Sequence, residues 1–390
     1  MGSLLLAIIY IAFISLGLPD GLLGAAWPVM FGELSVPVSY AGLISMIISG
    51  GTIVSSLFSD KLTTRLGTAK VTAISVTLTA GALFGFSQAT SFPVLCLLAI
   101  PYGLGAGAVD AALNNYVALH YTSRHMSWLH CFWGVGATVG PYVMGWALGA
   151  QMGWRGGYGI VAGIQLLLTI GLFISLPIWP KKDDAQPGHA DYEAPIGIRD
   201  AVKIRGVKAM LLAFFCQCAV EMAAALWTGT YLVEFRGMDS QTAATFTALS
   251  YVGITVGRFL CGFISERFGD KNMIRLGACV MLSGVAMMLL PLESDVMACT
   301  GLIVIGLGCA PVYPSIIHAT PTNFGRENTH AIVGIQMASA YTGSTLMPPI
   351  FGFIAQEISI ALFPAFLGVL TAAMFLLTER VNRVTQKEKA

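Results

Sequence analysis

The chain alternates between long apolar stretches and short polar segments that hold most of its charged residues. Many of these stretches reach about 20 residues, the length that an α-helix needs to cross roughly 30 Å of hydrocarbon. We find twelve of them and predict an all-α membrane protein with twelve transmembrane helices. The predicted spans are Leu4–Phe31, Val38–Phe58, Val71–Ser87, Phe92–Tyr121, Ser127–Ala150, Gly156–Ile178, Val207–Val233, Gln241–Ile264, Met273–Leu290, Val296–Ala319, Ala331–Ala355 and Ile358–Leu377.

A polar segment, which includes the run KKDDAQPGHADYEAP, separates six predicted spans from the next six. This composition indicates a solvated cytoplasmic linker. An acid followed by a tryptophan recurs on both sides of it, as Asp20 with Trp27 and as Glu221 with Trp227. Parallel repeats of this kind place a substrate site at their interface near the membrane midplane. We therefore predict two pseudo-symmetric six-helix bundles, 1–178 and 207–390, joined by a linker at 179–206.

The composition agrees with a membrane protein, because 56% of the 390 residues are hydrophobic and 11% are charged. A soluble core does not use so much apolar surface. All but Arg155 and Arg236 of the 21 lysines and arginines fall on one side of the predicted topology. The positive-inside rule then makes both termini cytoplasmic. We expect a monomer in the plasma (inner) membrane, with the lipid bilayer and a small-molecule substrate as partners and no nucleic acid.

Three carboxylates, Asp20, Asp110 and Glu221, lie in the middle of long apolar stretches. An ionised carboxylate at bilayer depth costs roughly 2.5–3.5 kcal/mol on insertion scales, so it normally faces an internal cavity or a proton relay. We predict that these three acids are proton-coupling residues, with hydrogen bonding between helices as the structural alternative. Pro19 removes a backbone hydrogen bond and frees the carbonyl of Ser15. A sodium site at Asp20 therefore stays open as a second option.

The segment GFISERFGDK at 262–271 resembles the G-x-x-x-[DE]-R-x-G-x-[RK] loop of the major facilitator superfamily, at the same place between spans eight and nine. The fragments GLPDGLLGAAWP, GLGAGAVDAALNNY, WLHCFWGVGATVGP, CAVEMAAALW and GLGCAPVYPSIIHATP are similar to the fucose-permease-like (fucose-galactose-glucose:proton symporter) group. This resemblance implies the major facilitator fold and proton-coupled uptake of a sugar or related polyol by alternating access. It also implies that, of Asp20 and Asp110, one exchanges the coupling proton and the other helps to bind sugar hydroxyls, and which acid does which stays open.

Polar and aromatic side chains near the buried acids are the further candidates for sugar binding. Asn114 lies one helical turn from Asp110 on the same face, and the indoles of Trp27 and Trp227 offer flat faces to a pyranose. Helix bridging by asparagine and interfacial anchoring by tryptophan are the structural alternatives. The candidate substrate-binding residues are Asp20, Trp27, Asp110, Asn114, Trp227, Tyr313, Gln336 and Tyr341.

Charges in the cytoplasmic loops are the predicted gating residues. Ion pairs that form when the transporter opens outward and break when it opens inward bias the two states. Arg258 lies inside a span, and we expect it to pair with Asp60 or Glu266 or to extend to the interface. The full gating set is Asp60, Arg65, Arg258, Glu266, Arg267 and Asp270.

The sequence carries no phosphate-binding loop, no metal-ligand cluster and no nucleophile elbow, so we predict neither an enzyme nor a cofactor or metal site. The eight cysteines have no zinc or disulfide spacing. The expected coupling ion is H+, with Na+ as the alternative. Gly136-x-x-x-Gly140-Pro141 resembles a motif found in antiporters, which keeps proton-coupled efflux of drugs or metabolites open as the alternative function.

Overall fold

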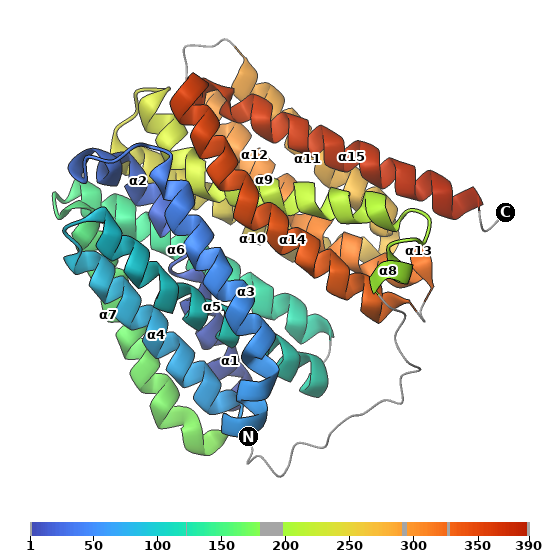
Figure 1. Ribbon diagram of the computed structural model, residues 1–390, viewed down its shortest axis with the longest axis horizontal. Helices are drawn as coiled ribbons and strands as arrows, with labels where there is room; N and C mark the ends of the chain where they lie inside the picture. The colour runs from blue at the N-terminus through green and yellow to red at the C-terminus, as the bar shows by residue number, and fades with distance from the viewer. Residues whose placement is uncertain (1, 122, 180–197, 291–294, 326–327, 388–390) are drawn as a thin grey trace. The chain divides into compact units, whose positions relative to one another are not determined.

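The computed structural model describes residues 2–121, 123–179, 198–290, 295–325 and 328–387, which form long helices joined by short connections (Figure 1). Short 3-10 turns at Leu176–Ile178 and Ile360–Leu362 and a π-helical turn at Ala355–Ser359 extend some of the helices. The α-helices are α1 (Gly2–Gly17), α2 (Leu22–Glu33), α3 (Tyr40–Leu66), α4 (Thr68–Gln88), α5 (Phe92–His120), α6 (Ser123–Gly149), α7 (Gly153–Ser175), α8 (Ile198–Ala201), α9 (Val207–Glu234), α10 (Ser240–Phe268), α11 (Asp270–Leu289), α12 (Asp295–His318), α13 (Thr320–Phe324), α14 (Thr329–Ile354) and α15 (Phe363–Lys387).

Ten ranges among the described residues are helical, long and apolar enough to cross a membrane. Leu4–Glu33 covers most of α1 and all of α2, and Ile332–Thr385 covers most of α14 and of α15. The all-helical part of the sequence prediction is confirmed. The count of twelve spans and their division into two six-helix bundles stay predictions.

The chain forms two compact units, each of which collects more than one stretch of sequence. The first contains Met1–Gln186, Ala225–Tyr251 and Gly352–Ile360, and the second contains Pro187–Ala224, Val252–Phe351 and Ala361–Ala390. Most of the predicted linker at 179–206 lies outside the described residues, and the short helix α8 lies in its described end. The predicted boundaries at 178 and 207 stay a prediction.

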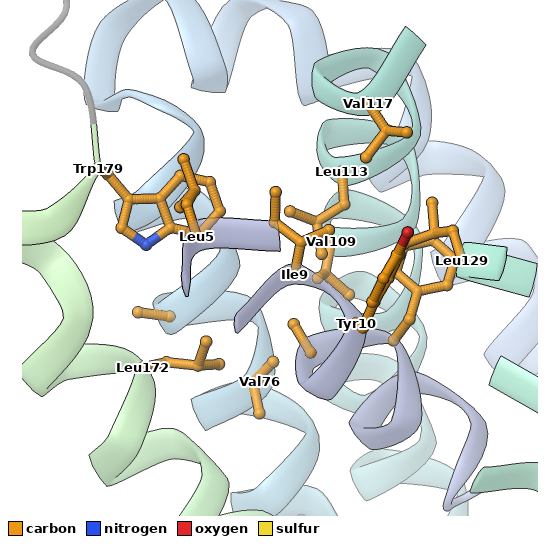
Figure 2. Packing of buried hydrophobic residues seen from close by; sticks show 13 residues of the cluster. Leu5, Ile9, Tyr10, Val76, Val109, Leu113, Val117, Leu129, Leu172 and Trp179 are labelled. Carbon is orange, nitrogen blue, oxygen red and sulfur yellow. The ribbon is translucent and has the colours of Figure 1, made fainter. Parts of the chain in front are cut away.

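In the first unit, an apolar cluster surrounds α1 (Figure 2). Ile9, from α1, is fully buried together with side chains of α4, α5, α6 and α7. In a membrane, such a side chain leaves lipid and not water when it packs against protein. Its packing therefore stabilises the fold through dispersion contacts and not through the hydrophobic effect. The labelled members of the cluster are Leu5, Ile9, Tyr10, Val76, Val109, Leu113, Val117, Leu129, Leu172 and Trp179.

In the second unit, α11 packs against α12 and α15. Gly284 and Gly301 face each other so closely that a Cβ added to either would lie 2.5 Å from the carbonyl oxygen of the other. On another side of α11, Arg275 donates two hydrogen bonds to Glu379 of α15, at 2.6 and 2.7 Å. Small residues bring α11 and α12 into backbone contact, and a two-pronged ion pair joins α11 to α15.

The α1–α6 contact in the first unit also depends on glycine. A Cβ at Gly17 of α1 would lie 2.1 Å from the carbonyl oxygen of Trp133, and one at Gly136 of α6 would lie 2.2 Å from that of Ile14. A Cβ at Gly140 would lie 2.0 Å from the carbonyl oxygen of Leu18. Real Cβ atoms do not approach oxygen this closely, so the two backbones lie in direct contact along this line.

We predict opposite effects for two glycine-to-alanine changes in helix interiors. Gly136→Ala forces α6 away from α1 and should lower the free energy of unfolding by about 1–3 kcal/mol, the usual cost of overpacking. Gly81→Ala, in α4, meets nothing within 4 Å, and should be neutral or stabilise by about 0.5–1 kcal/mol because alanine favours helix. Thermal unfolding of purified protein in detergent measures both, and equal Tm values for the two variants would contradict the close α1–α6 contact.

Candidate functional site

The first predicted span is not one continuous helix, because the backbone departs from helical geometry at residues 18–21, which we call the α1 break. Pro19 has no N–H to donate to Ser15, and the N–H of Asp20 donates to the Gly17 carbonyl at 2.9 Å. Gly21 has φ +75°, in the left-handed region that glycine enters at little cost. The sequence predicted one span over Leu4–Phe31; the structure divides it into two helices and places Asp20 in a non-helical turn between α1 and α2.

The carbonyl that Pro19 releases does not lack a partner. Gln165, from α7, donates a hydrogen bond from Nε2 to the Ser15 carbonyl oxygen at 2.6 Å. Both residues are almost completely buried. A backbone carbonyl without a donor in a membrane interior costs several kcal/mol, so Gln165 allows the break to exist at this depth.

The Asp20 carboxylate accepts a hydrogen bond from the indole of α6. Trp133 Nε1 donates to Asp20 Oδ2 at 2.8 Å. The ring of Tyr251, from α10, meets the Trp133 ring nearly at right angles, with centroids 6.3 Å apart. Gly21 also lies against Tyr251, since a Cβ there would be 2.7 Å from Tyr251 Cε2. The α1 break thus brings together an acid and two aromatic rings from three helices.

Asp110, on α5, makes a separate contact. Asn114 Nδ2 donates to Asp110 Oδ1 at 2.8 Å and to its backbone oxygen at 3.0 Å. The sequence placed the two residues one turn apart on the same face, and the structure adds this hydrogen bond, while their binding of sugar stays a prediction. The described contacts of Asp20 and Asp110 have no residue in common, so the expected meeting of the two acids stays a prediction.

The direction of Asp110 follows from helix geometry. Gly103 and Gly107 pack against backbone oxygens of α3, while Val109 and Leu113 belong to the cluster around α1. At 100° per residue, Asp110 projects between these two faces of α5. Its carboxylate is therefore directed to the α1–α3 side of α5, between two packed helix neighbours.

Glu221 on α9 has a cation as its partner. Arg258 Nη2 lies 3.1 Å from Glu221 Oε1, with side chains 16% and 19% exposed respectively. For Arg258, the sequence favoured Asp60 or Glu266, whose side chains lie outside the described part of the structure. The pair with Glu221 was not predicted, although residues at 221 and 258 are the acid and the cation set deepest in the later spans.

The two tryptophans predicted to stack on a sugar are both fully buried, at 0% exposure. Trp27 Nε1 donates to the Val38 carbonyl oxygen at 2.7 Å. Trp227 packs against Gly352, where a Cβ would lie 2.6 Å from its Cζ2. In this conformation the structure gives both rings packing contacts, and their stacking on substrate stays a prediction.

The predicted polar ligands of the second unit have protein contacts of their own. Tyr313 points its hydroxyl at the sulfur of Met337, 3.5 Å away. Gln336 is buried and accepts a hydrogen bond from Thr320 at 3.0 Å. Tyr341 is half-buried on α14. Binding of substrate by these residues stays a prediction.

Among the predicted gating residues, Asp270 has a described partner, because His318 Nδ1 lies 2.8 Å from Asp270 Oδ2. Arg65 and Arg267 are exposed at the ends of α3 and α10. Asp60 and Glu266 belong to helices, but their side chains are outside the described set. The Asp270–His318 contact joins α11 to α12, within the second unit.

Sequence reasoning missed Trp133, Tyr251 and Gln165. Trp133 lies in the fragment WLHCFWGVGATVGP, three residues before Gly136. The spacing of small residues there signals close helix packing, but nothing in it says that the indole reaches an acid 113 residues away. A buried glutamine such as Gln165 is a better signal, because an amide within a span needs a partner.

Comparisons with known proteins agree with this architecture. A profile of the Major Facilitator Superfamily matches residues 9–330 and 236–390. The hexuronate transporter of Bacillus subtilis (strain 168) is 21% identical over 361 residues, which cover 86% of this chain and 83% of that protein. The glucose/mannose transporter GlcP of the same organism is 20% identical over 323 residues, which cover 81% of this chain and 79% of that protein.

The fold also matches a solved structure of a variant of the nucleoside transporter NupG. The TM-score is 0.75 at 15% sequence identity, with 96% of this chain and 98% of that chain covered. At this level of identity the similarity shows a common fold.

We predict that Glu221 and Arg258 are energetically coupled. Glu221→Gln or Arg258→Gln alone leaves an uncompensated charge and should cost about 3–5 kcal/mol of stability. Removing both charges should cost clearly less than the sum of the single changes. A double-mutant cycle of Tm values in detergent measures the coupling, and strictly additive losses would contradict the ion pair.

Proposed function

The chain belongs to the Major Facilitator Superfamily, and on this premise we propose that it takes up a neutral sugar or related polyol together with protons. The family and its characterised relatives make the protein a secondary transporter of the membrane, not an enzyme. Alternating access carries out the uptake in our proposal. The earlier resemblance to the fucose-permease-like group agrees with this substrate class.

One observation carries the proposal, namely the Asp20 carboxylate held in the α1 break by the Trp133 indole at 2.8 Å. Discontinuous helices in transporters supply binding groups for substrate and coupling ion near the midplane. Asp20 is partly exposed, so a proton can reach it. When open to the outside, the carboxylate takes up a proton and sugar hydroxyls bind beside it. The neutral, loaded site then crosses at low electrostatic cost and releases both inside.

The contacts of the α1 break favour a proton over sodium. A sodium site at Asp20 would use the Ser15 carbonyl that Pro19 releases, since hard cations take oxygen ligands. That oxygen accepts from Gln165 instead. Sodium there would have to share a buried oxygen that already accepts a 2.6 Å hydrogen bond, whereas a proton needs the carboxylate alone.

The charge of the site favours a neutral substrate. Two of the relatives are a glucose/mannose transporter and a hexuronate transporter. With one proton on Asp20, a bound hexuronate would give the loaded site the negative charge of its own carboxylate, which is costly at membrane depth. A neutral sugar adds no charge, and its hydroxyls can still hydrogen-bond to the protonated carboxyl group of Asp20.

Proton-coupled efflux is the alternative function, and its sequence signal has a packing explanation. Gly136 and Gly140 form the antiporter-like motif, and both lie in backbone contact with α1. Close packing of the two helices needs small residues at these two positions whether the protein takes its substrate up or exports it. The motif therefore does not distinguish uptake from efflux, and the proton assay below does.

We further propose that both termini are cytoplasmic, that the protein lies in the plasma membrane and that it acts as a monomer. The first of these rests on the distribution of the 21 lysines and arginines.

We predict that adding sugar to vesicles with the protein alkalinises the medium, and that Asp20→Asn abolishes this signal together with concentrative uptake. The asparagine amide does not bind and release a proton near neutral pH, so coupled uptake should stop. Exchange of sugar between the two sides of the membrane needs no net proton movement and should persist. Acidification on adding substrate would indicate efflux. Full alkalinisation by Asp20→Asn would exclude Asp20 as the coupling acid.

The matched control is Asp239→Asn. Asp239 lies outside the spans, and its Oδ1 accepts from the Thr242 backbone N–H at 2.9 Å. Hydrogen bonds from Thr242 lower the pKa of this carboxyl below its ordinary value, so it stays ionised near neutral pH. Asparagine also caps a helix well. Asp239→Asn should leave uptake and alkalinisation unchanged.

We predict that Gln165→Leu introduces sodium sensitivity. The change leaves the Ser15 carbonyl without its described donor, which should cost about 1–3 kcal/mol, and exposes an oxygen that sodium can use with Asp20. Uptake with and without sodium at fixed pH measures this. Thr169→Val is the control one turn away on α7, since the Thr169 hydroxyl donates within its own helix. Sodium-dependent uptake by the unmodified protein would contradict proton coupling.

A further inference from the structure

The indole N–H groups of four tryptophans have different described partners, and one of these is an acid within a span. Trp27 donates to a backbone carbonyl, and Trp179 donates to Ser175. Trp154 donates to Glu33, at the end of α2. Trp133 donates to Asp20 in the α1 break. Trp133 is therefore the tryptophan whose position is tied to the proposed coupling acid.

Exposure also separates Trp133 from the tryptophans that the sequence favoured. Trp27 and Trp227 are fully buried, so neither ring offers a face to a ligand in this conformation. Trp133 is half-buried. Tyr251 makes an edge-to-face contact with its ring, and the residue as a whole keeps some accessible surface.

The position of the Trp133 ring is fixed from both ends. A Cβ added to Gly17 of α1 would lie 2.1 Å from the backbone oxygen of Trp133. The two backbones are thus in contact, and α6 cannot move closer to α1 or rotate freely at this point. The indole N–H of Trp133 is held at 2.8 Å by Asp20. A ring restrained at its backbone and at its tip loses little freedom when a ligand binds, which favours binding.

An accessible aromatic surface beside a carboxylate is a combination that recognises a pyranose. The ring of a pyranose has apolar C–H surfaces that pack on an aromatic face, and its equatorial hydroxyls donate hydrogen bonds at the edge. A carboxylate offers about four lone-pair sites, so accepting the indole N–H leaves capacity for hydroxyls. Ligand sites commonly combine apolar walls with a few placed polar groups in this way.

We propose that Trp133 is the aromatic platform of the substrate site, on which the ring of a neutral pyranose lies while its hydroxyls donate to Asp20. This proposal rests on the proposed function and adds the residue that recognises the sugar ring. It assigns the stacking role to α6 instead of the α2 and α9 tryptophans. Trp133 thereby links substrate and coupling ion, because the residue that contacts the sugar also hydrogen-bonds the acid.

The test compares Trp133→Leu and Trp133→Phe with matched changes at Trp154, a fully buried tryptophan outside the candidate binding set. Purified protein is titrated with D-glucose, D-mannose, D-galactose and L-fucose, and with tetramethylammonium as an organic cation. For any sugar that the unmodified protein binds, Trp133→Leu should raise the Kd about tenfold, the scale of one lost aromatic contact. Trp133→Phe keeps a ring but loses the N–H, so it should rescue a large part of this loss.

The Trp154 variants separate binding from folding. Trp154→Phe and Trp154→Leu change a fully buried ring and remove its hydrogen bond to Glu33, so they should lower Tm while leaving sugar Kd within twofold. Sugar should also change the tryptophan fluorescence of the unmodified protein, and this change should vanish in Trp133→Phe.

Two outcomes overturn the platform and remain distinguishable. If the protein binds and takes up a sugar but Trp133→Leu keeps its Kd, the platform fails and the proposed function stands. If no sugar binds and tetramethylammonium does, both the sugar function and the pyranose platform fail. A Trp133→Leu protein that is folded by its Tm, binds sugar weakly and is rescued by phenylalanine supports the platform.

Discussion

The geometry of the site depends on one missing hydrogen-bond donor, the N–H that Pro19 lacks. Within a membrane, every backbone polar group needs a partner from the protein. Gln165 supplies that partner to the Ser15 carbonyl, and Gly21 takes the positive φ that completes the turn. Because these conditions are met, α1 can stop at Gly17 and place Asp20 on irregular backbone.

Small residues then determine where the large ones lie. Gly17, Gly136 and Gly140 bring the backbones of α1 and α6 into contact, and this contact carries Trp133 to the height of the α1 break. A longer separation between the helices would take the indole out of reach of Asp20. The same glycines that resemble an antiporter motif in the sequence thus have a defined mechanical role here, which is to hold an aromatic donor against an acid.

From the sequence alone, composition and local order predicted the all-helical fold and placed three acids within apolar stretches, and the resemblance of the 262–271 loop indicated the superfamily. Partners between helices could not be obtained in this way. Trp133 reaches Asp20 because α1 and α6 are rotated and spaced by packing, which no local pattern encodes. The sequence suggested Asp60 or Glu266 as the ion-pair partner of Arg258. The described partner is Glu221, on the preceding helix. Trp27 and Trp227 had the right spacing from acids but face packed neighbours.

The partners of the three acids also separate their roles, which the sequence had left equal. Asp20 and Asp110 accept hydrogen bonds from neutral groups, an indole and an amide. The described donors to these two acids carry no charge, so protonating either acid takes no counter-charge from its described donor. Protonating Glu221 would leave the Arg258 guanidinium, 3.1 Å away, without its described counter-charge. An arginine does not lose its proton in proteins, and an uncompensated charge at this depth is costly. A carboxylate that must cycle between charged and neutral forms is better served by a neutral donor, so we propose that the coupling proton binds in the first unit and that Glu221 stays in a fixed ion pair.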